Sequence, residues 1–185
     1  FSWPGLMDSV VSVVRARAVE KSLEIRQEIA PDLPTEIIGH PQLLRQVLLN
    51  LLINAIKFTE SGSVTLRCLP AADEAGRQLL RFEVEDTGKG IEPGLQARIF
   101  EPFWTASTDN RAEEQPGTGL GLDIVRRNVE YMGGVAALHS EPGKGSTFWF
   151  ELPLTAADAT AAPDSAASAG THAGAPLDGD ILLVD

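Results

Sequence analysis

The sequence is poor in several residue types that mark particular classes of protein. Its 185 residues include one cysteine, Cys68, and three histidines, so no disulfide can form within the chain and no zinc cluster is indicated. No apolar run approaches the roughly 18 residues that a membrane-spanning helix needs, and no basic and apolar leader opens the chain. Basic residues are few as well: 15 Lys and Arg against 26 Asp and Glu give a net charge of −11, which argues against a nucleic-acid-binding surface. We therefore expect no contact with nucleic acid or membrane, and a cytoplasmic location.

The composition divides the chain into three parts. Residues 155–179 are rich in Ala, Pro, Ser, Gly and Thr and hold no Lys or Arg, which predicts a flexible linker. Residues 180–185 are a short aliphatic run bounded by acids. That run is either a frayed tail or the first strand of a further domain. Residues 1–154 have the mixed composition of a folded domain.

Hydrophobic periodicity predicts the elements of residues 1–154. Leu6, Val10, Val13 and Val14 recur at helical spacing, and residues 23–29 alternate like a half-buried strand. Pro41 begins a second helix with a broad apolar face. There follow two strands joined as a hairpin, a short helix after Pro93, a helix ending at residues 133–134, and strands at 135–140 and 146–153. This order predicts a two-layer α/β (α+β) sandwich in which helices cover one face of a mixed, largely antiparallel sheet.

The second helix carries a polar stripe. Asn50, Asn54 and Lys57 are spaced i, i+4 and i+7, so they share one side of the helix. An amide oxygen can ligate a hard cation, and an ammonium can bind a phosphate. The alternative is that these are solvated positions of an amphipathic helix.

Two glycine-rich segments add to this stripe. Asp86-Thr87-Gly88-Lys89-Gly90 directly follows a strand, where a carboxylate can accept hydrogen bonds from an exocyclic amine and glycines let the backbone approach a flat ligand; a plain turn is the alternative. The segment Gly117-Thr118-Gly119-Leu120-Gly121-Leu122 opens a helix, where backbone N–H groups and the positive helix end can bind an anion. Its spacing is neither that of a Walker loop nor that of a Rossmann fingerprint, and a hinge is the alternative.

Two further segments complete the pattern. Phe100-Glu101-Pro102-Phe103-Trp104 is an aromatic cluster that we interpret mainly as an anchor for the polar loop that follows. Gly143-Lys144-Gly145-Ser146-Thr147 is a hairpin turn, from which we expect Thr147 to reach a ligand.

The order and spacing of these segments resemble the ATP-binding catalytic domain of bacterial sensor histidine kinases, in the superfamily that includes gyrase, Hsp90 and MutL (the Bergerat fold). Residues 50–59 resemble the N box, 86–90 and 117–122 the two glycine boxes, and 100–103 the F box. The resemblance covers essentially residues 1–154. Residues 181–185 resemble the first strand of a receiver domain, which would make the parent chain a hybrid kinase.

The resemblance implies a role for each of these residues. Asp86 would bind the adenine amine, with Thr147 near the same edge through water, while Phe58, Ile91 and Leu122 would line the nucleotide pocket. Asn54 would coordinate Mg²⁺, with Asn50 and Lys57 near the phosphates. The backbone of residues 117–121 would bind the phosphates, and Arg111 is the candidate for the terminal phosphate. Phe100, of the F box, is included among the ATP-binding candidates.

The resemblance also implies an activity. It is ATP-dependent transfer of a phosphoryl group to a histidine, with ATP and Mg²⁺ as cofactors. The chain has no phosphoacceptor motif, so we expect the acceptor helical hairpin to lie upstream and this fragment to be a monomer unable to phosphorylate itself, whereas the parent would be a homodimer. The alternatives are a non-catalytic nucleotide-sensing module, an anti-sigma type serine kinase, and a clamp-type ATPase. The last is disfavoured because Asn50 stands where the hydrolases have a glutamate base.

Overall fold

The structure is a computed structural model that describes residues 1–102 and 121–155. Its elements follow one another as α1 (Trp3–Glu20), β1 (Glu24–Ile29), α2 (Pro41–Phe58), β2 (Ser63–Ala72), β3 (Gln78–Asp86), α3 (Pro93–Gln96), α4 (Gly121–Tyr131), β4 (Val135–Glu141) and β5 (Gly145–Pro153). The expected element order is therefore confirmed for the described residues.

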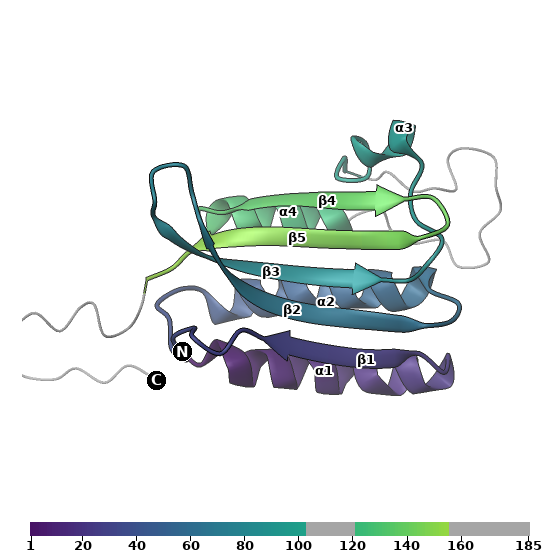
Figure 1. Ribbon diagram of the computed structural model, residues 1–185, viewed down its shortest axis with the longest axis horizontal. Helices are drawn as coiled ribbons and strands as arrows, with labels where there is room; N and C mark the ends of the chain where they lie inside the picture. The colour runs from purple at the N-terminus through teal and green to yellow at the C-terminus, as the bar shows by residue number, and fades with distance from the viewer. Residues whose placement is uncertain (103–120, 156–185) are drawn as a thin grey trace, which may run out of the picture.

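The five strands form one sheet in the order β1-β2-β3-β5-β4. β1 runs parallel to β2, and the other three pairings are antiparallel. Figure 1 shows α1, α2 and α4 side by side on one face of this sheet. The predicted two-layer sandwich with a mixed, largely antiparallel sheet is confirmed.

The two long helices begin at different kinds of cap. Ser2 precedes α1, and its hydroxyl accepts a hydrogen bond from the Gly5 N–H at 3.4 Å. His40 precedes α2 but makes no side-chain cap bond, so α2 relies on Pro41 at its first position. One expectation for α1 is wrong: Val13 is 59% exposed, and Val11 is buried in its place. The buried stripe runs through residues 3, 6–7, 10–11, 14 and 18, and a period of 3.6 places Val13 at the margin of this stripe and Val11 within it.

The hydrophobic core lies between the helices and the inner face of the sheet. Trp3 of α1 packs edge-on against Phe82 of β3 at 6.0 Å between ring centroids, and Phe82 stacks on Phe150 of β5 at 5.0 Å. Aromatic pairs in these arrangements contribute about 0.5–1.5 kcal/mol beyond the area they bury. Helix α1 and strand β1 thus belong to the same core as the rest of the domain.

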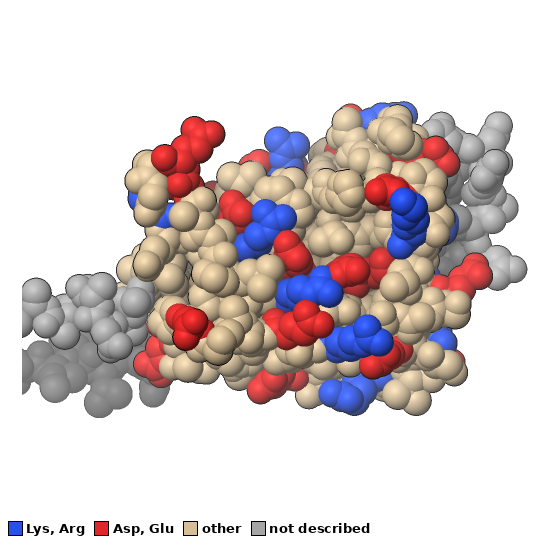
Figure 2. Space-filling view, viewed as in Figure 1, with Lys and Arg blue, Asp and Glu red and all other residues tan. Residues whose placement is uncertain are grey.

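The outer face of the sheet is charged. Arg67 of β2 and Arg81 of β3 lie between acidic side chains of neighbouring strands, and Figure 2 shows the blue and red groups alternating across this face. Arg81 also lies 3.9 Å from the ring centroid of Trp149. These arginines are neutralised locally: their partners are Glu28 and Glu85 for the first, and Glu83 and Glu151 for the second.

The end of the domain is fixed by a backbone contact. The Ile38 N–H donates to the Thr155 carbonyl oxygen at 2.9 Å, so the chain is still bonded to the domain at the first residue of the predicted linker. The rest of that linker, and the predicted receiver strand at residues 180–185, lie outside the described residues.

Candidate functional site

The candidate site lies at one end of the sheet. The last residue of β3, the turn between β4 and β5, the last turn of α2, the start of α4 and helix α3 all lie at this end (Figure 1). The segments that carry the predicted site residues are far apart in the sequence, and the antiparallel pairings bring them to the same edge.

Asp86 is the buried acid of this edge. It ends β3 in the same phase as Leu80, Phe82 and Val84, so its side chain faces the helices, and it is only 5% exposed. Its Oδ1 accepts the Gly88 N–H at 2.9 Å, and the carboxylate also accepts the Ser146 N–H. Burial raises the pKa of Asp86, and the two N–H donors oppose this shift. A carboxylate that is buried in spite of the free-energy cost of losing its hydration is typical of a ligand-binding group.

The two glycines after Asp86 are required by close contacts. A Cβ on Gly88 would lie 2.5 Å from the carbonyl oxygen of Phe58, at the end of α2. Gly90 has φ +69°, and a Cβ there would lie 2.0 Å from the Glu141 carbonyl oxygen. The Asp86–Gly90 segment is therefore packed between the last residue of α2 and the end of β4.

The polar stripe of α2 faces the start of α4. The Asn50 Nδ2 donates to the Gly121 carbonyl oxygen at 3.3 Å. Asn54 lies one turn further on, and its Nδ2 would be 3.8 Å from a Cβ on Gly121. Both amides are half-buried. The two asparagines therefore lie beside the first residue of α4, where helix N–H groups and the positive end of the helix dipole favour an anion.

Two ammonium groups lie near the aromatic ring of Phe58, at the end of α2. The Lys57 Nζ lies 4.7 Å and the Lys89 Nζ 5.3 Å from the centroid of the Phe58 ring. This places positive charge beside the stripe in a chain that is acidic overall. Lys89 was not among the predicted site residues, although its place between two glycines of the Asp86–Gly90 segment was a signal for it.

A third lysine fixes the same end of α2. The Lys21 Nζ donates to the carbonyl oxygens of Ile56 and Lys57, each at 2.8 Å, and to that of Thr59 at 3.3 Å. A cation on these carbonyls satisfies the open end of the helix and its negative dipole. The contact joins residues 35 to 38 positions apart, and no local sequence pattern indicates it.

The structure does not bring Thr147 to Asp86. From residue 146 onward the buried positions of β5 are 146, 148, 150 and 152, so Thr147 points to the outer face of the sheet, opposite Glu85. Ser146 is the residue paired with Asp86, and it is 6% exposed on the inner face. The expectation for Thr147 is thus corrected by the alternation of the strand: Ser146 takes its place beside the carboxylate.

The remaining described candidates are apolar. Ile91 and Leu122 are half-buried and pack against the core. Phe100 packs edge-on against Phe148 at 6.4 Å, which is the anchoring role expected for the aromatic cluster.

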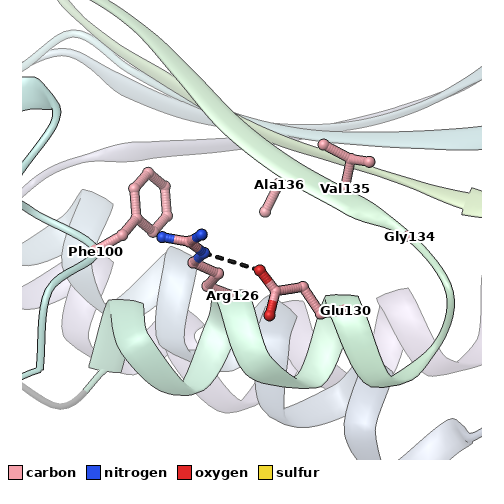
Figure 3. Close-up of a pocket in the computed structure, with 6 residues that line it drawn as sticks. All are labelled: Phe100, Arg126, Glu130, Gly134, Val135 and Ala136. Carbon is pink, nitrogen blue, oxygen red and sulfur yellow. Dashed lines mark hydrogen bonds and ion pairs between the residues drawn. The ribbon is translucent and has the colours of Figure 1, made fainter.

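Phe100 also lines a hollow of about 210 Å³ between α4 and β4. Figure 3 shows the Arg126–Glu130 ion pair on the α4 side of this hollow. Of the predicted site residues that the structure describes, Phe100 is the one that lines it, so the hollow is separate from the edge around Asp86. The other candidates, Arg111 and residues 117–120, lie outside the described residues.

Comparison with known proteins identifies the family. Residues 39–156 match the family described as "Histidine kinase-, DNA gyrase B-, and HSP90-like ATPase". The chain belongs to this ATPase family. The match includes the whole of the edge around Asp86 and supports ATP binding, whereas α1 and β1 precede it.

The similar curated relatives of this ATPase domain are sensor kinases. Sensor histidine kinase AruS of Pseudomonas aeruginosa is 42% identical over 91% of this chain, and the sensory/regulatory protein RpfC of Xanthomonas campestris is 41% identical over 83%. Signal transduction histidine-protein kinase BarA of Escherichia coli is 38% identical over 80%. The chain spans only 17%, 21% and 16% of these three proteins, respectively.

Solved structures agree with this family. Full-length ShkA in complex with AMPPNP has a TM-score of 0.73 and 42% identity, over 85% of this chain and 31% of that one. The nucleotide-free catalytic domain of histidine kinase ThkA has a TM-score of 0.68 and 26% identity, over 84% of this chain and 94% of that one. Among residues 1–102 and 121–155, no helix is both long and apolar enough to span a membrane.

The site also fits the magnesium ion that the resemblance implies. The described residues contain no group of three or more His, Cys, Asp or Glu that could hold a metal by themselves. Asn54 offers one amide oxygen beside the expected phosphate position. One protein oxygen together with phosphate oxygens and water is a donor set typical of Mg²⁺ bound with a nucleotide.

Proposed function

We propose that this chain binds Mg·ATP at the edge around Asp86 and donates the γ-phosphate to a histidine on the helical hairpin of a two-component sensor kinase. The observation that carries the proposal is the buried Asp86 carboxylate. It is held by the N–H groups of Gly88 and Ser146, and its burial raises its pKa. Membership in the ATPase family and the AMPPNP complex of ShkA support a nucleotide as its ligand.

In this proposal the base and the phosphates are bound by different elements. Asp86 accepts a hydrogen bond from the adenine amine, and Phe58, Ile91 and Leu122 form apolar walls for the ring. The polyphosphate extends along α2 toward the start of α4, past the side chains of Asn50, Asn54 and Lys57. Mg²⁺, when bound, neutralises charge on the phosphate oxygens, and Asn54 orients it. Catalysis then rests on positioning and electrostatics, as in other phosphoryl transfers.

Asn50 favours transfer over hydrolysis. A base for an attacking water must accept a proton, and an amide cannot do so at neutral pH. Its Nδ2 is also bonded to the Gly121 carbonyl oxygen, which fixes the side chain toward α4. We therefore favour a phosphoryl-transfer enzyme over a clamp-type ATPase.

The acceptor hairpin, a receiver domain and a homodimeric parent chain remain part of the proposal. The chain spans about a fifth or less of three curated relatives, so the parts that would supply these partners are not in the structure. We expect the chain alone to be a monomer that binds nucleotide without labelling itself.

The proposal is tested by binding and by transfer. Calorimetry with a non-hydrolysable ATP analogue should show Mg²⁺-dependent binding that Asn54→Ala weakens. The matched control is Asn128→Ala, because the Asn128 amide contacts Gln46 at 3.0 Å on the exposed α2–α4 surface. Radiolabelled ATP should then label a separately prepared acceptor hairpin from a related kinase only when this chain is added. Binding without transfer to any of several hairpins would support the nucleotide-sensing module instead, and ATP hydrolysis without transfer would support the clamp-type ATPase.

A further inference from the structure

Ser140 is a buried hydroxyl at the centre of the hydrogen bonds behind Asp86. It lies on β4 opposite Ser146, and it is 7% exposed. Its Oγ accepts the Ile91 N–H at 2.8 Å, donates to the Gly145 carbonyl oxygen at 3.0 Å, and lies 3.0 Å from the Ser146 Oγ. Ser146 in turn donates its backbone N–H to the Asp86 carboxylate. Ser140 thus contacts the Asp86 carboxylate only indirectly, through Ser146.

The count of hydrogens at Ser140 decides the direction of the Ser140–Ser146 contact. A serine hydroxyl has one proton to donate and two lone pairs that accept. A carbonyl oxygen can only accept, so the Ser140 proton is used on Gly145. The remaining contact must then run from the Ser146 hydroxyl to Ser140. Ser146 is left with its lone pairs as the groups available beside Asp86.

Ser140 is itself held from the α3 side. The Gln96 Nε2 donates to the Ile91 carbonyl oxygen at 2.9 Å and to the Ser140 carbonyl oxygen at 3.0 Å. The Gly143 N–H donates to the Lys89 carbonyl oxygen at 2.7 Å, so the segment after Asp86 is attached to the β4–β5 turn at a second point. The Ser140 hydroxyl thus uses its one proton and both lone pairs on groups that are themselves fixed. It has no alternative orientation.

We propose that Ser140 is a positioning residue for base specificity: it takes the Ser146 proton and so makes Ser146 a hydrogen-bond acceptor next to the acceptor Asp86. This rests on the proposed function, because it concerns the base bound at that site. Two adjacent acceptors suit the 6-amino group of adenine, which donates, and repel the 6-oxo group of guanine, which accepts. Without Ser140 the Ser146 hydroxyl can rotate and donate to an oxo group.

The test compares two nucleotides in wild type and three variants. Kd values for non-hydrolysable ATP and GTP analogues are measured by calorimetry on wild type, Ser140→Ala and Ser140→Thr, with Ser12→Ala as control. Ser12 is an exposed serine of α1 whose hydroxyl donates to the Asp8 carbonyl oxygen at 2.8 Å. We expect Ser140→Ala to reduce the preference for ATP over GTP by roughly threefold to tenfold, the effect of one hydrogen bond. Ser140→Thr keeps the hydroxyl and should restore the preference, and Ser12→Ala should leave it unchanged.

The outcomes separate this proposal from the proposed function. If wild type binds the ATP analogue selectively but Ser140→Ala weakens both analogues by the same factor, Ser140 is merely structural and the proposal is wrong. An absence of base preference in wild type also overturns it. No binding of either analogue to wild type overturns the proposed function and this proposal together. If Ser140→Ala fails to fold, Ser146→Ala decides, because removal of the acceptor oxygen should reduce the preference in the same way.

Discussion

Replacing Asp86 by asparagine separates ligand binding from folding. A hydrogen bond to an ionised group contributes about 1.5–3 kcal/mol, so losing the carboxylate alone weakens binding by roughly tenfold to a hundredfold. The structure adds to this loss. An asparagine has one acceptor oxygen, and the Gly88 and Ser146 N–H groups require it. Its NH₂ group then faces the amine of the ligand, donor against donor, so we expect Kd for an ATP analogue to rise by at least about 100-fold.

The same substitution should stabilise the protein without ligand. Burial raises the pKa of Asp86 in the folded state above its ordinary value. The folded carboxyl therefore holds its proton more tightly than the unfolded one, and stability falls as pH rises from the ordinary value through the raised one. Asp86→Asn removes that cost. Its Tm at pH 7 should exceed that of wild type, and the difference should shrink as pH falls through this window.

Asp73 provides a control of opposite sign. It lies in the β2–β3 hairpin, and its carboxylate accepts the N–H groups of Ala75 and Arg77 and pairs with the Arg77 side chain. These contacts lower the pKa of Asp73, so it stabilises the fold at neutral pH and loses that effect as pH falls. Asp73→Asn should lower Tm at pH 7 and leave Kd unchanged. Thermal melts at several pH values and calorimetry check both variants, and an Asp86→Asn protein that binds the analogue within threefold of wild type would refute the assignment.

Three further predictions concern residues outside the ligand contacts. His40→Asp should supply the missing cap of α2 and stabilise by about 0.5–2 kcal/mol in denaturant unfolding, whereas His40→Ala should not; an unchanged midpoint for the aspartate variant would contradict this. Lys21→Met should destabilise by about 1–2 kcal/mol through loss of the bonds to the end of α2, while Arg15→Met on the exposed side of α1 should have little effect. The Cys68 thiol is fully buried and burial raises its pKa to about 12, so it should react with a thiol reagent at pH 8 only after unfolding; rapid labelling of the folded chain would show that β2 opens.

Much of the fold was predictable because its signals are local. Pro41 and the apolar face behind it determine where α2 begins and which side it buries, and the alternation of Leu80, Phe82 and Val84 determines the inner face of β3. The strand order, with β5 between β3 and β4, depends on pairings between distant segments. Periodicity within one segment holds no information about its neighbours, so only the class of sheet could be predicted.

The error at Thr147 arose because the motif was assigned without asking which face of β5 each of its residues occupies. Residues 148, 150 and 152 are apolar and mark the inner face of β5, and counting back by two gives Ser146 rather than Thr147. The same count along β3 places Asp86 on that inner face. Strand phase was therefore enough to place Asp86 and Ser146 on the same inner face, whereas their pairing depends on the register between β3 and β5. Lys21 is different in kind, because its contacts join α1 to carbonyls more than thirty residues away.

The distribution of charge explains how so acidic a chain can present a site for a polyanion. Arg67 and Arg81 are neutralised by glutamates on the outer face of the sheet, so they add nothing to the potential at the site. Lys57 instead lies over the Phe58 ring, at the end of the helix that carries the asparagines. Exposed charges more than about 8–10 Å away are largely screened at physiological salt. In the proposed site, we therefore expect the affinity for a nucleotide to depend on Lys57 and the start of α4 rather than on the net charge of −11.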